Sequence, residues 1–231
     1  NLTNPAPIQF VAQNFVLDQN CRILNPTDGT TILSAPFVIN PSAVTSVNVE
    51  DFRCYKDMAY VLLRDDTQAI VYNCSSKIQS ILSDNSGMSI SDVPSTFAFK
   101  NDIMYVGFNT GTIYAYNLPL KTGENNAVRS RTSISPPLIS DMTFVKDSLV
   151  FTHCPFVNLS PANDSDRIST ICLTDSSTLS TAPIATVSFP LSGRSIIAGG
   201  SGWEPGLEIH PTSNVVYACN TADNQNAIHV T

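Results

Sequence analysis

Short runs of β-branched and aromatic residues, separated by polar turns, make up much of the chain. Each run is four or five residues long, which suits a β-strand and is too short for a helix. A helical period of 3.6 residues is scarcely visible in the sequence. The clearest runs are CRIL at 21–24, AIVY at 69–72, TIYAY at 112–116, ISTIC at 168–172 and AIHV at 227–230. The pattern therefore predicts an all-β fold.

A period of 45 residues relates these runs to one another. The stretch FRCYKDMAYVLL from Phe52 is followed at that spacing by FAFKNDIMYVGF from Phe97 and by MTFVKDSLVFTH from Met142. One acidic residue keeps its place in the polar turn of each copy: Asp57, Asp102 and Asp147. We also assign a first copy to IQFVAQNFVL and a fifth to LEIHPTSNVVYAC, the latter displaced by an insertion between Asn158 and Pro190. A fixed period of this length indicates a repeat architecture.

Each repeat unit predicts a meander of about four short strands, because TTIL, IQSIL, TSIS and ATVSF supply further strand candidates. Such a unit cannot bury both of its faces alone and must pack against its neighbours, as a propeller blade does. We expect one β-propeller domain over residues 1–231, built from about five four-stranded blades. The repeat units lie near 7–51, 52–96, 97–141, 142–197 and 198–231. The fifth unit lacks a strand, so either the N-terminal residues supply it or the chain continues beyond Thr231, in which case a sixth blade is the alternative.

Two segments resemble blades of the broad superfamily that includes NHL, YVTN and gluconolactonase-type propellers: GTIYAYN and WEPGLEIHPTSNVVYACNTADNQNAIHV. The resemblance concerns the architecture and covers roughly five blades. In gluconolactonase-type propellers a glutamate at the entrance of a blade helps to hold a divalent ion that activates water. The resemblance implies that Glu204 takes this place as a metal ligand, while the other ligands stay unassigned. The simpler alternative is a tight glycine loop in which Trp203 plugs one end of the propeller.

The six cysteines contain no CxxC motif, which favours disulfides in an oxidising compartment over a zinc site. Two predicted bonds join strands of one blade each, Cys54 with Cys74 and Cys154 with Cys172. The remaining bond, Cys21 with Cys219, would fasten a five-bladed ring. The alternative is a set of buried thiols in a cytosolic protein.

Four N-glycosylation sequons point to the same compartment: Asn1-Leu-Thr, Asn73-Cys-Ser, Asn158-Leu-Ser and Asn163-Asp-Ser. A chain that begins Asn-Leu-Thr is consistent with removal of a signal peptide, although an excised fragment would begin in the same way. We therefore expect a secreted, extracellular glycoprotein.

Charge and hydropathy exclude two classes of partner. The formal net charge is −7, and the chain shows no basic patch that would meet the phosphates of a nucleic acid. No apolar run approaches the roughly 18 residues that span a bilayer. We expect neither nucleic-acid binding nor membrane insertion.

Other polar residues are weaker candidates for chemistry. His153, His210 and His229 are scattered singly, and strand-end and turn positions explain them. The acidic turns 163–167 and 221–226 have the oxygen ligands that calcium takes, but polar hairpin loops explain them equally well. Arg129-Ser-Arg131 is predicted as a solvated turn, or as a site for a processing protease.

Two functions of different classes remain. The first is an extracellular recognition or structural module without catalysis, which binds a protein, a glycan or another copy of itself and needs no cofactor. The alternative is a gluconolactonase-like lactonase or hydrolase that requires calcium or another divalent ion, with Glu204 as a ligand. The sequence contains none of the common hydrolase or nucleotide-binding motifs, which favours the first.

Overall fold

The computed structural model describes a protein built from β-strands. It describes residues 8–12, 15–18, 23–24, 27–28, 30–33, 48–56, 58–64, 68–132, 134, 137–145, 147–154, 167–172, 179, 184–188, 206–209, 216–220 and 227–230. These residues form five sheets and contain no helix, so the all-β prediction is confirmed. In this described part of the chain, no helix is long and apolar enough to cross a lipid bilayer.

The chain divides into two compact units, which are described separately. The first unit comprises Asn1–Pro94 and Pro119–Ala127 and holds two sheets. Its first sheet has the strand order β1 (Ile8–Ala12), β2 (Phe15–Asp18), β3 (Ile23–Leu24) and β4 (Thr31–Leu33). Its second sheet contains β5 (Asn48–Tyr55), β6 (Met58–Arg64), β7 (Ala69–Asn73), β8 (Ile78–Ser83) and, beside β8, β12 (Gly123–Asn126). Strand β1 lies against β5.

The second unit comprises Ser95–Leu118 and Val128–Thr231 and holds three sheets. The first is formed by β9 (Pro94–Lys100), β10 (Ile103–Phe108), β11 (Ile113–Asn117) and β13 (Arg129–Arg131). The next is formed by β14 (Leu138–Val145), β15 (Ser148–Cys154), β16 (Arg167–Cys172) and β17 (Ile184–Ser188). The last contains β18 (Gly206–Ile209), β19 (Val216–Asn220) and β20 (Ala227–Val230). Strand β14 lies against both β10 and β18.

Most predicted strands are present, but one is misplaced. The fourth strand of the third meander is β13 at Arg129–Arg131, whereas TSIS, at 132–135, was predicted. The prediction of a solvated turn at 129–131 is also wrong, because Arg129 and Arg131 pair with Ala115 and Ile113 of β11. The long side chains of arginine can cover apolar surface while their charged ends reach a polar partner. In this case the Arg131 guanidinium donates to the Leu179 carbonyl at 3.4 Å.

Among the described residues, turn positions lie between the first and second strands of three sheets. Asn101 and Asp102 connect β9 to β10 and both have positive φ, 51° and 58°, as a type I′ hairpin turn requires. Lys56, with φ of 48°, opens the turn between β5 and β6, and Asp147 lies in the turn between β14 and β15. Asp102 and Asp147 thus lie in turns as predicted, while Asp57 is outside the described residues.

The hydrophobic core of the second unit lies between its first two sheets. Its buried members are Ala98, Tyr105, Ile113, Ala115, Ile134, Ile139, Met142, Leu149, Phe151 and Leu179. Gly107 permits close approach here, because a Cβ added to it would lie 2.7 Å from a methyl carbon of Ile139. In the first unit, the inner strand β6 is buried on both faces, which explains why residues 59–63 are apolar without alternation.

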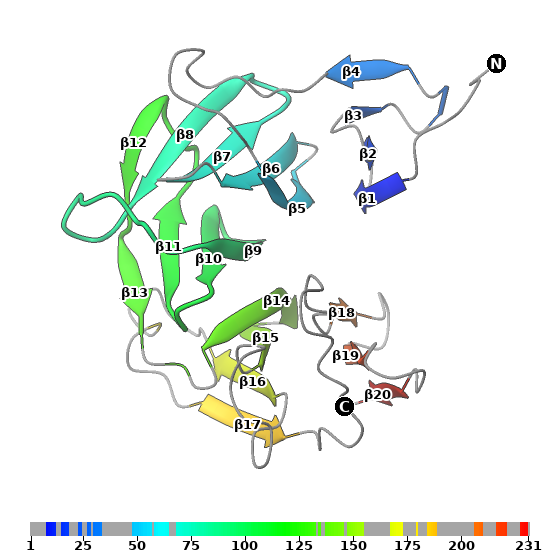
Figure 1. Ribbon diagram of the computed structural model, residues 1–231, viewed down its shortest axis with the longest axis vertical. Helices are drawn as coiled ribbons and strands as arrows, with labels where there is room; N and C mark the ends of the chain where they lie inside the picture. Colours follow the sequence, from blue (N-terminus) through cyan, green and yellow to red (C-terminus); the bar gives the residue numbers. More distant parts are fainter. Residues whose placement is uncertain are drawn as a thin grey trace, which may run out of the picture. The chain divides into compact units, whose positions relative to one another are not determined.

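Strand β12 was not predicted from the sequence. It lies between β11 and β13 along the chain but pairs in parallel with β8, at the edge of the sheet of β5–β8 (Figure 1). Residues 119–127 therefore belong to the first unit, although the residues on either side of them belong to the second. An added edge strand covers amide and carbonyl groups that would otherwise be free to pair with another chain.

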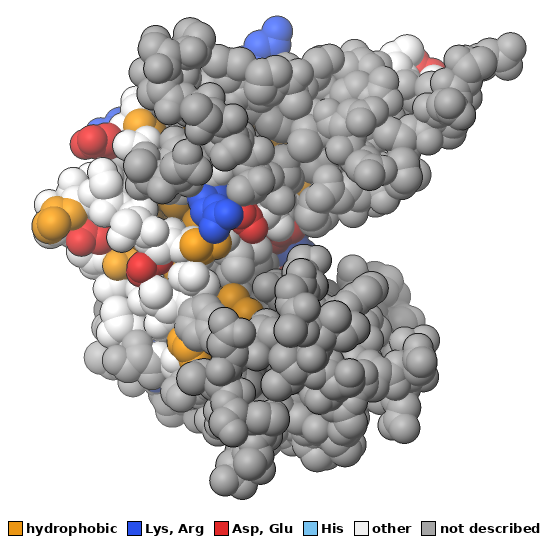
Figure 2. Space-filling view, viewed as in Figure 1, with side chains coloured by type: hydrophobic (Ala, Val, Ile, Leu, Met, Phe, Trp, Pro, Cys, Tyr) orange, Lys and Arg blue, Asp and Glu red, His pale blue; other side chains and the backbone are white. Residues whose placement is uncertain are grey.

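Exposed apolar side chains are few among the described residues. Met88 and Val128 are the large hydrophobic residues with high exposure, 67% and 42%. On the face drawn in Figure 2, the hydrophobic side chains of the described residues occur as separate patches. Single apolar residues of this kind are normal on a protein surface.

Alanine at Gly111 should destabilise the protein more than alanine at Gly123. Both glycines have positive φ, 78° and 82°, so each substitution carries backbone strain of about 1–2 kcal/mol. A Cβ at Gly111 would also collide with the Ile134 carbonyl oxygen, while nothing lies within 4 Å at Gly123. Urea denaturation should show that Gly111→Ala lowers the free energy of unfolding by about 2 kcal/mol or more beyond the loss caused by Gly123→Ala. Equal losses would contradict the described packing of this turn.

Candidate functional site

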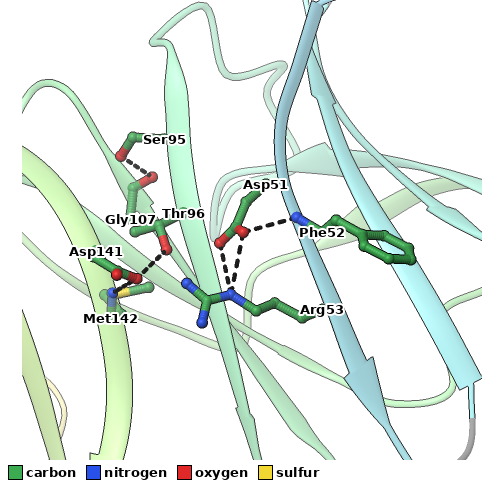
Figure 3. A network of polar contacts seen from close by, with 8 residues as sticks. All are labelled: Asp51, Phe52, Arg53, Ser95, Thr96, Gly107, Asp141 and Met142. Carbon is green, nitrogen blue, oxygen red and sulfur yellow. Dashed lines mark hydrogen bonds and ion pairs between the residues drawn. The ribbon is translucent and has the colours of Figure 1, made fainter. Parts of the chain in front are cut away.

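A β-bulge in β5 places Asp51 in a buried position. Val49 pairs with Leu63 and Asp51 with Leu62, so Glu50 is the extra residue in the first strand of its sheet. Asp51 is 6% exposed. Its Oδ1 accepts the backbone N–H of Phe52 at 2.7 Å, and its two oxygens lie 3.1 and 2.9 Å from Arg53 Nε (Figure 3). The carboxylate therefore has an amide and a cation as partners within its own strand.

Strand β14 has the same bulge and the same aspartate contact. Ile139 pairs with His153 and Asp141 with Thr152, so one residue of β14 is again extra. The Oδ1 of Asp141 accepts the N–H of Met142 at 2.8 Å (Figure 3). Asp141 lies two periods of 45 residues after Asp51. The sequence period and the local geometry therefore agree at this position.

Strand β9 supplies two hydroxyl groups to β14. The Thr96 hydroxyl donates to Asp141 Oδ1 over a long 3.4 Å, and Thr96 is only 1% exposed. The Ser95 hydroxyl is within hydrogen-bond reach of the carbonyl of Gly107, at 3.1 Å, and of Ile139. Ile139 precedes the bulge of β14, where the ladder of backbone hydrogen bonds is interrupted. A side chain of the neighbouring sheet thus approaches a carbonyl at this interruption.

Sequence reasoning did not single out three polar residues of the first strands. Asp51, Thr96 and Asp141 are spaced by 45 residues and directly precede Phe52, Phe97 and Met142, the residues that begin the aligned copies. Extending the repeat alignment by one residue would have revealed a polar position in the first strand of three sheets. We call Asp51, Thr96 and Asp141 the bulge row, because they occupy the same position of the sequence repeat and two of them lie at a bulge.

The extra residue of the β5 bulge carries a second carboxyl group. Burial raises the pKa of Glu50, and the charge of Arg64 partly opposes this effect. The Arg64 Nε lies 3.5 Å from a Glu50 carboxylate oxygen, and the two side chains are 37% and 23% exposed. Glu50 is thus held by a partly exposed ion pair at the end of β6.

An ion pair also links the first two sheets of the second unit. Lys100 Nζ, at the end of β9, lies 2.8 Å from Asp147 Oδ1 and 5.5 Å from the centre of the Phe144 ring. Phe144 meets Tyr105 edge to face, with ring centres 5.2 Å apart. Burial raises the pKa of Tyr105, and the charge of Arg129 partly offsets this. The ion pair of Lys100 with Asp147 therefore lies beside the packed rings of Phe144 and Tyr105.

The bulge row acts as a set of hydrogen-bond acceptors and donors for the chain itself. Asp51 and Asp141 both satisfy the amide of the following residue, and Arg53 neutralises Asp51. In the described part of the chain, no three His, Cys, Asp or Glu side chains gather in a way that would hold a metal ion. The geometry fits a structural role in which buried polar groups keep the bulges in one conformation.

Several predicted site residues lie outside the described residues: Glu204, Trp203, His210, Asn1, Asn158, Asn163 and Cys21. The metal-ligand prediction for Glu204 and the glycosylation predictions at these three sequons therefore stay predictions, and glycosylation at the described Asn73 stays one as well. His229 lies in β20. His153 lies in β15, is 2% exposed and packs on the Phe151 ring, with ring centres 5.3 Å apart.

The Asn73 sequon lies at the end of β7 and in the turn that follows. The side-chain oxygen of Asn73 accepts the backbone N–H of Ser75 at 3.0 Å and of Ser76 at 3.1 Å. Its Nδ2 lies 3.5 Å from the sulfur of Met58. The asparagine thus forms an Asx turn, a side-chain mimic of a backbone turn.

The register contradicts the predicted bond between Cys154 and Cys172. In the pairing of β15 with β16, Cys172 lies opposite Ser148, whereas Cys154 follows His153 at the other end of β15. Six residues of strand separate the two positions, which is about 20 Å. A disulfide requires Cα atoms within roughly 7 Å. This predicted pair is therefore wrong.

Cys54 and Cys74 are separated by one strand. Cys54 pairs with Ala59 of β6, and the Cys74 amide donates to the Ala59 carbonyl from the other side at 2.8 Å. Two strand spacings amount to roughly 10 Å, too far for a disulfide, and the structure contains no bond between them. Burial and the nearby Cys54 thiol raise the pKa of Cys74 to about 12. The bond of Cys21 with Cys219 stays a prediction.

Comparison with known proteins identifies fold neighbours and no family. No known protein family and no curated protein matches the chain. One similar solved structure is the computationally designed Ika8 protein, with 14% identity and a TM-score of 0.52 over 96% of this chain. This chain spans 56% of the length of that protein. Another is KlAtg21 in complex with the coiled-coil of AgAtg16, with 13% identity and a TM-score of 0.56 over 99% of this chain and 70% of that chain. At these identities the likeness concerns the fold alone.

Replacing Asp51 by alanine should cost about 2–3 kcal/mol of folding stability. The change leaves the buried amide of Phe52 without this acceptor and removes the carboxylate that pairs with Arg53, whose side chain is 32% exposed. Asp51→Asn keeps an oxygen acceptor and should cost less. The matched control is Asp147→Ala, whose side chain is 67% exposed in its ion pair and which should cost about 1 kcal/mol or less.

Urea denaturation at neutral pH measures all three variants. If Asp51→Ala is as mild as Asp147→Ala, the carboxylate at the bulge does not have the structural role assigned to it.

Proposed function

We propose that this protein is a secreted, N-glycosylated β-propeller of five blades that acts as an extracellular recognition or structural module without catalysis. The fold part of the proposal rests on five consecutive sheets whose first three or four strands follow chain order. The recurrence of the bulge in β5 and β14, two sequence periods apart, supports a common blade design.

The commitment of the bulge row to the chain itself is the observation that carries the functional proposal. Buried carboxylates that act as a general acid, a base or a metal ligand need lone pairs available to substrate or ion. In the bulge row the carboxylates instead accept backbone amides at 2.7 and 2.8 Å. This favours a structural role for the first strand of each sheet, and it favours the loops and sheet edges as the surfaces that bind a partner.

A similar structure supports binding as a use of this fold. KlAtg21, which shares the fold at 13% identity, was solved in complex with the coiled-coil of AgAtg16. A chain with this arrangement of sheets can therefore dock a protein segment. We propose the same class of activity here, with an extracellular protein or glycan, or a second copy of the chain, as the partner.

Secretion and glycosylation are proposed from the sequons. The Asn73 sequon can be tested without breaking its turn, because the amides of Ser75 and Ser76, and not their hydroxyls, donate to Asn73. Ser75→Ala removes the hydroxyl that a sequon requires, whereas Ser76→Ala alters the same turn outside the sequon.

In protein secreted from cultured eukaryotic cells, Ser75→Ala should lose the mass of one glycan at Asn73, and Ser76→Ala should lose none. Intact-mass measurement before and after peptide N-glycosidase treatment reads out both variants. An unmodified Asn73 in the wild-type protein would contradict glycosylation at this site.

The choice between binding and catalysis needs one preparation and two assays. We expect saturable binding to at least one member of a glycan array or a panel of purified extracellular proteins. We also expect no lactone hydrolysis above the buffer rate with calcium, manganese or zinc. Metal-dependent hydrolysis that is lost in Glu204→Gln and retained in Glu208→Gln would overturn the proposal in favour of a lactonase.

A further inference from the structure

The edge of β8 is occupied by a strand that is poorly suited to its position. Strand β12 pairs in parallel with β8 over four residues, Gly123 to Asn126 (Figure 1). Its sequence is Gly-Glu-Asn-Asn, and all of these residue types are depleted in β-strands. The facing residues of β8 are Ser80, Ile81, Leu82 and Ser83, of which three are 0–1% exposed. The edge of a well-buried strand is thus paired with a segment of low β-strand propensity.

Side-chain hydrogen bonds, rather than strand propensity, hold β12 in place. Asn125 is 8% exposed and makes three such bonds. Its Oδ1 accepts the amide of Lys121 at 3.0 Å, and its Nδ2 donates to the carbonyls of Lys121 at 2.9 Å and Gly123 at 2.8 Å. The Ser80 hydroxyl of β8 also donates to the Lys121 carbonyl at 2.9 Å. One asparagine therefore closes the turn that leads into the strand.

The two ends of this segment are anchored independently. Leu120 and Ala127 are 8% and 6% exposed, and the Ala127 amide donates to the Ser83 carbonyl at 3.0 Å. By contrast, Glu124 and Asn126 are exposed and Gly123 has open space around it. Local opening of residues 123–126 would therefore cost few buried apolar contacts.

We propose that the β8 edge is a strand-docking site, that β12 is its exchangeable intrachain occupant, and that an extended segment of a partner protein can replace it. The partner segment is an uncharged strand with β-branched residues, because such residues pair better than Gly-Glu-Asn-Asn along Ile81 and Leu82. In the absence of a partner, β12 occupies the edge. The apparent affinity of the protein for the partner segment is then the intrinsic affinity multiplied by the fraction of molecules in which the edge is open. This inference rests on the proposed recognition function and names its surface.

The test uses the full chain and a defined probe. The probe is a fluorescein-labelled hexapeptide, Thr-Val-Thr-Val-Thr-Val, and its control carries two central prolines, which cannot pair with a strand. Asn125→Ala releases β12 by removing its three side-chain bonds. Asn126→Ala is the matched control, since it changes the same residue type in the same strand at an exposed position.

Fluorescence anisotropy should show that Asn125→Ala binds the probe about tenfold more tightly than the wild-type protein. The Asn126→Ala variant should match the wild type, and no variant should bind the proline control. Equal affinities of Asn125→Ala and wild type, absence of binding, or equal binding of both peptides would overturn the inference.

Hydrogen exchange of the unmodified protein provides a measurement that does not depend on the variants. Amides of residues 124–126 should exchange at least about tenfold faster than those of the buried pair β6 and β7. If the amides of residues 124–126 were protected as strongly as those of β6 and β7, the claim that β12 is exchangeable would be wrong. The ligand screen for the recognition function does not depend on this edge. If that screen finds a ligand and the peptide does not bind, the strand-docking inference is wrong and the proposed recognition function stands.

Discussion

The bulges of the first strands are the constraint on which much of this structure depends. A bulge interrupts the ladder of backbone hydrogen bonds, and a buried polar group without a partner costs about 1–3 kcal/mol. In β5 and in β14 an aspartate at the bulge accepts the next amide. At the β14 bulge, Ser95 of β9 also approaches the carbonyl of Ile139. At the β14 bulge, polar side chains thus satisfy the interruption and also connect β9 with β14.

Sheet edges are governed by the same requirement for paired backbone groups. Strand β12 covers β8 although its residues have little tendency to form a strand, because Asn125 fixes the preceding turn. Side-chain hydrogen bonds are individually worth only about 1 kcal/mol, so such a strand can be held and yet be exchangeable. The bulges and the proposed docking surface therefore both depend on side-chain hydrogen bonds to backbone groups.

The strands could be predicted from the sequence wherever the apolar pattern decided them. The runs at 69–72, 112–116 and 227–230 coincide with β7, β11 and β20, because short β-branched runs bounded by polar turns have few other uses. Strand β12 could not be predicted, since Gly-Glu-Asn-Asn forms a strand only through the tertiary contact with β8. Arg129-Ser-Arg131 escaped prediction for a similar reason, because β11 supplies its pairing.

The candidate site was less accessible to sequence reasoning than the strands. Asp51 and Asp141 acquire their role from a one-residue irregularity in register, which composition and periodicity do not reveal. Two of the three predicted cysteine pairs are wrong because membership of one sheet does not imply proximity: six residues of strand separate Cys154 from Cys172, and β6 separates Cys54 from Cys74. Register, rather than strand content, decides both questions.

The most direct test of this account is the exchange of two backbone amides, those of Phe52 and Met142, measured by NMR in the unmodified protein. Each donates to a bulge aspartate, at 2.7 and 2.8 Å. The account predicts that both amides are protected as strongly as the central amides of their sheets, because their bonds open only when the sheet opens. Exchange of either amide at the rate of an exposed turn would contradict the account.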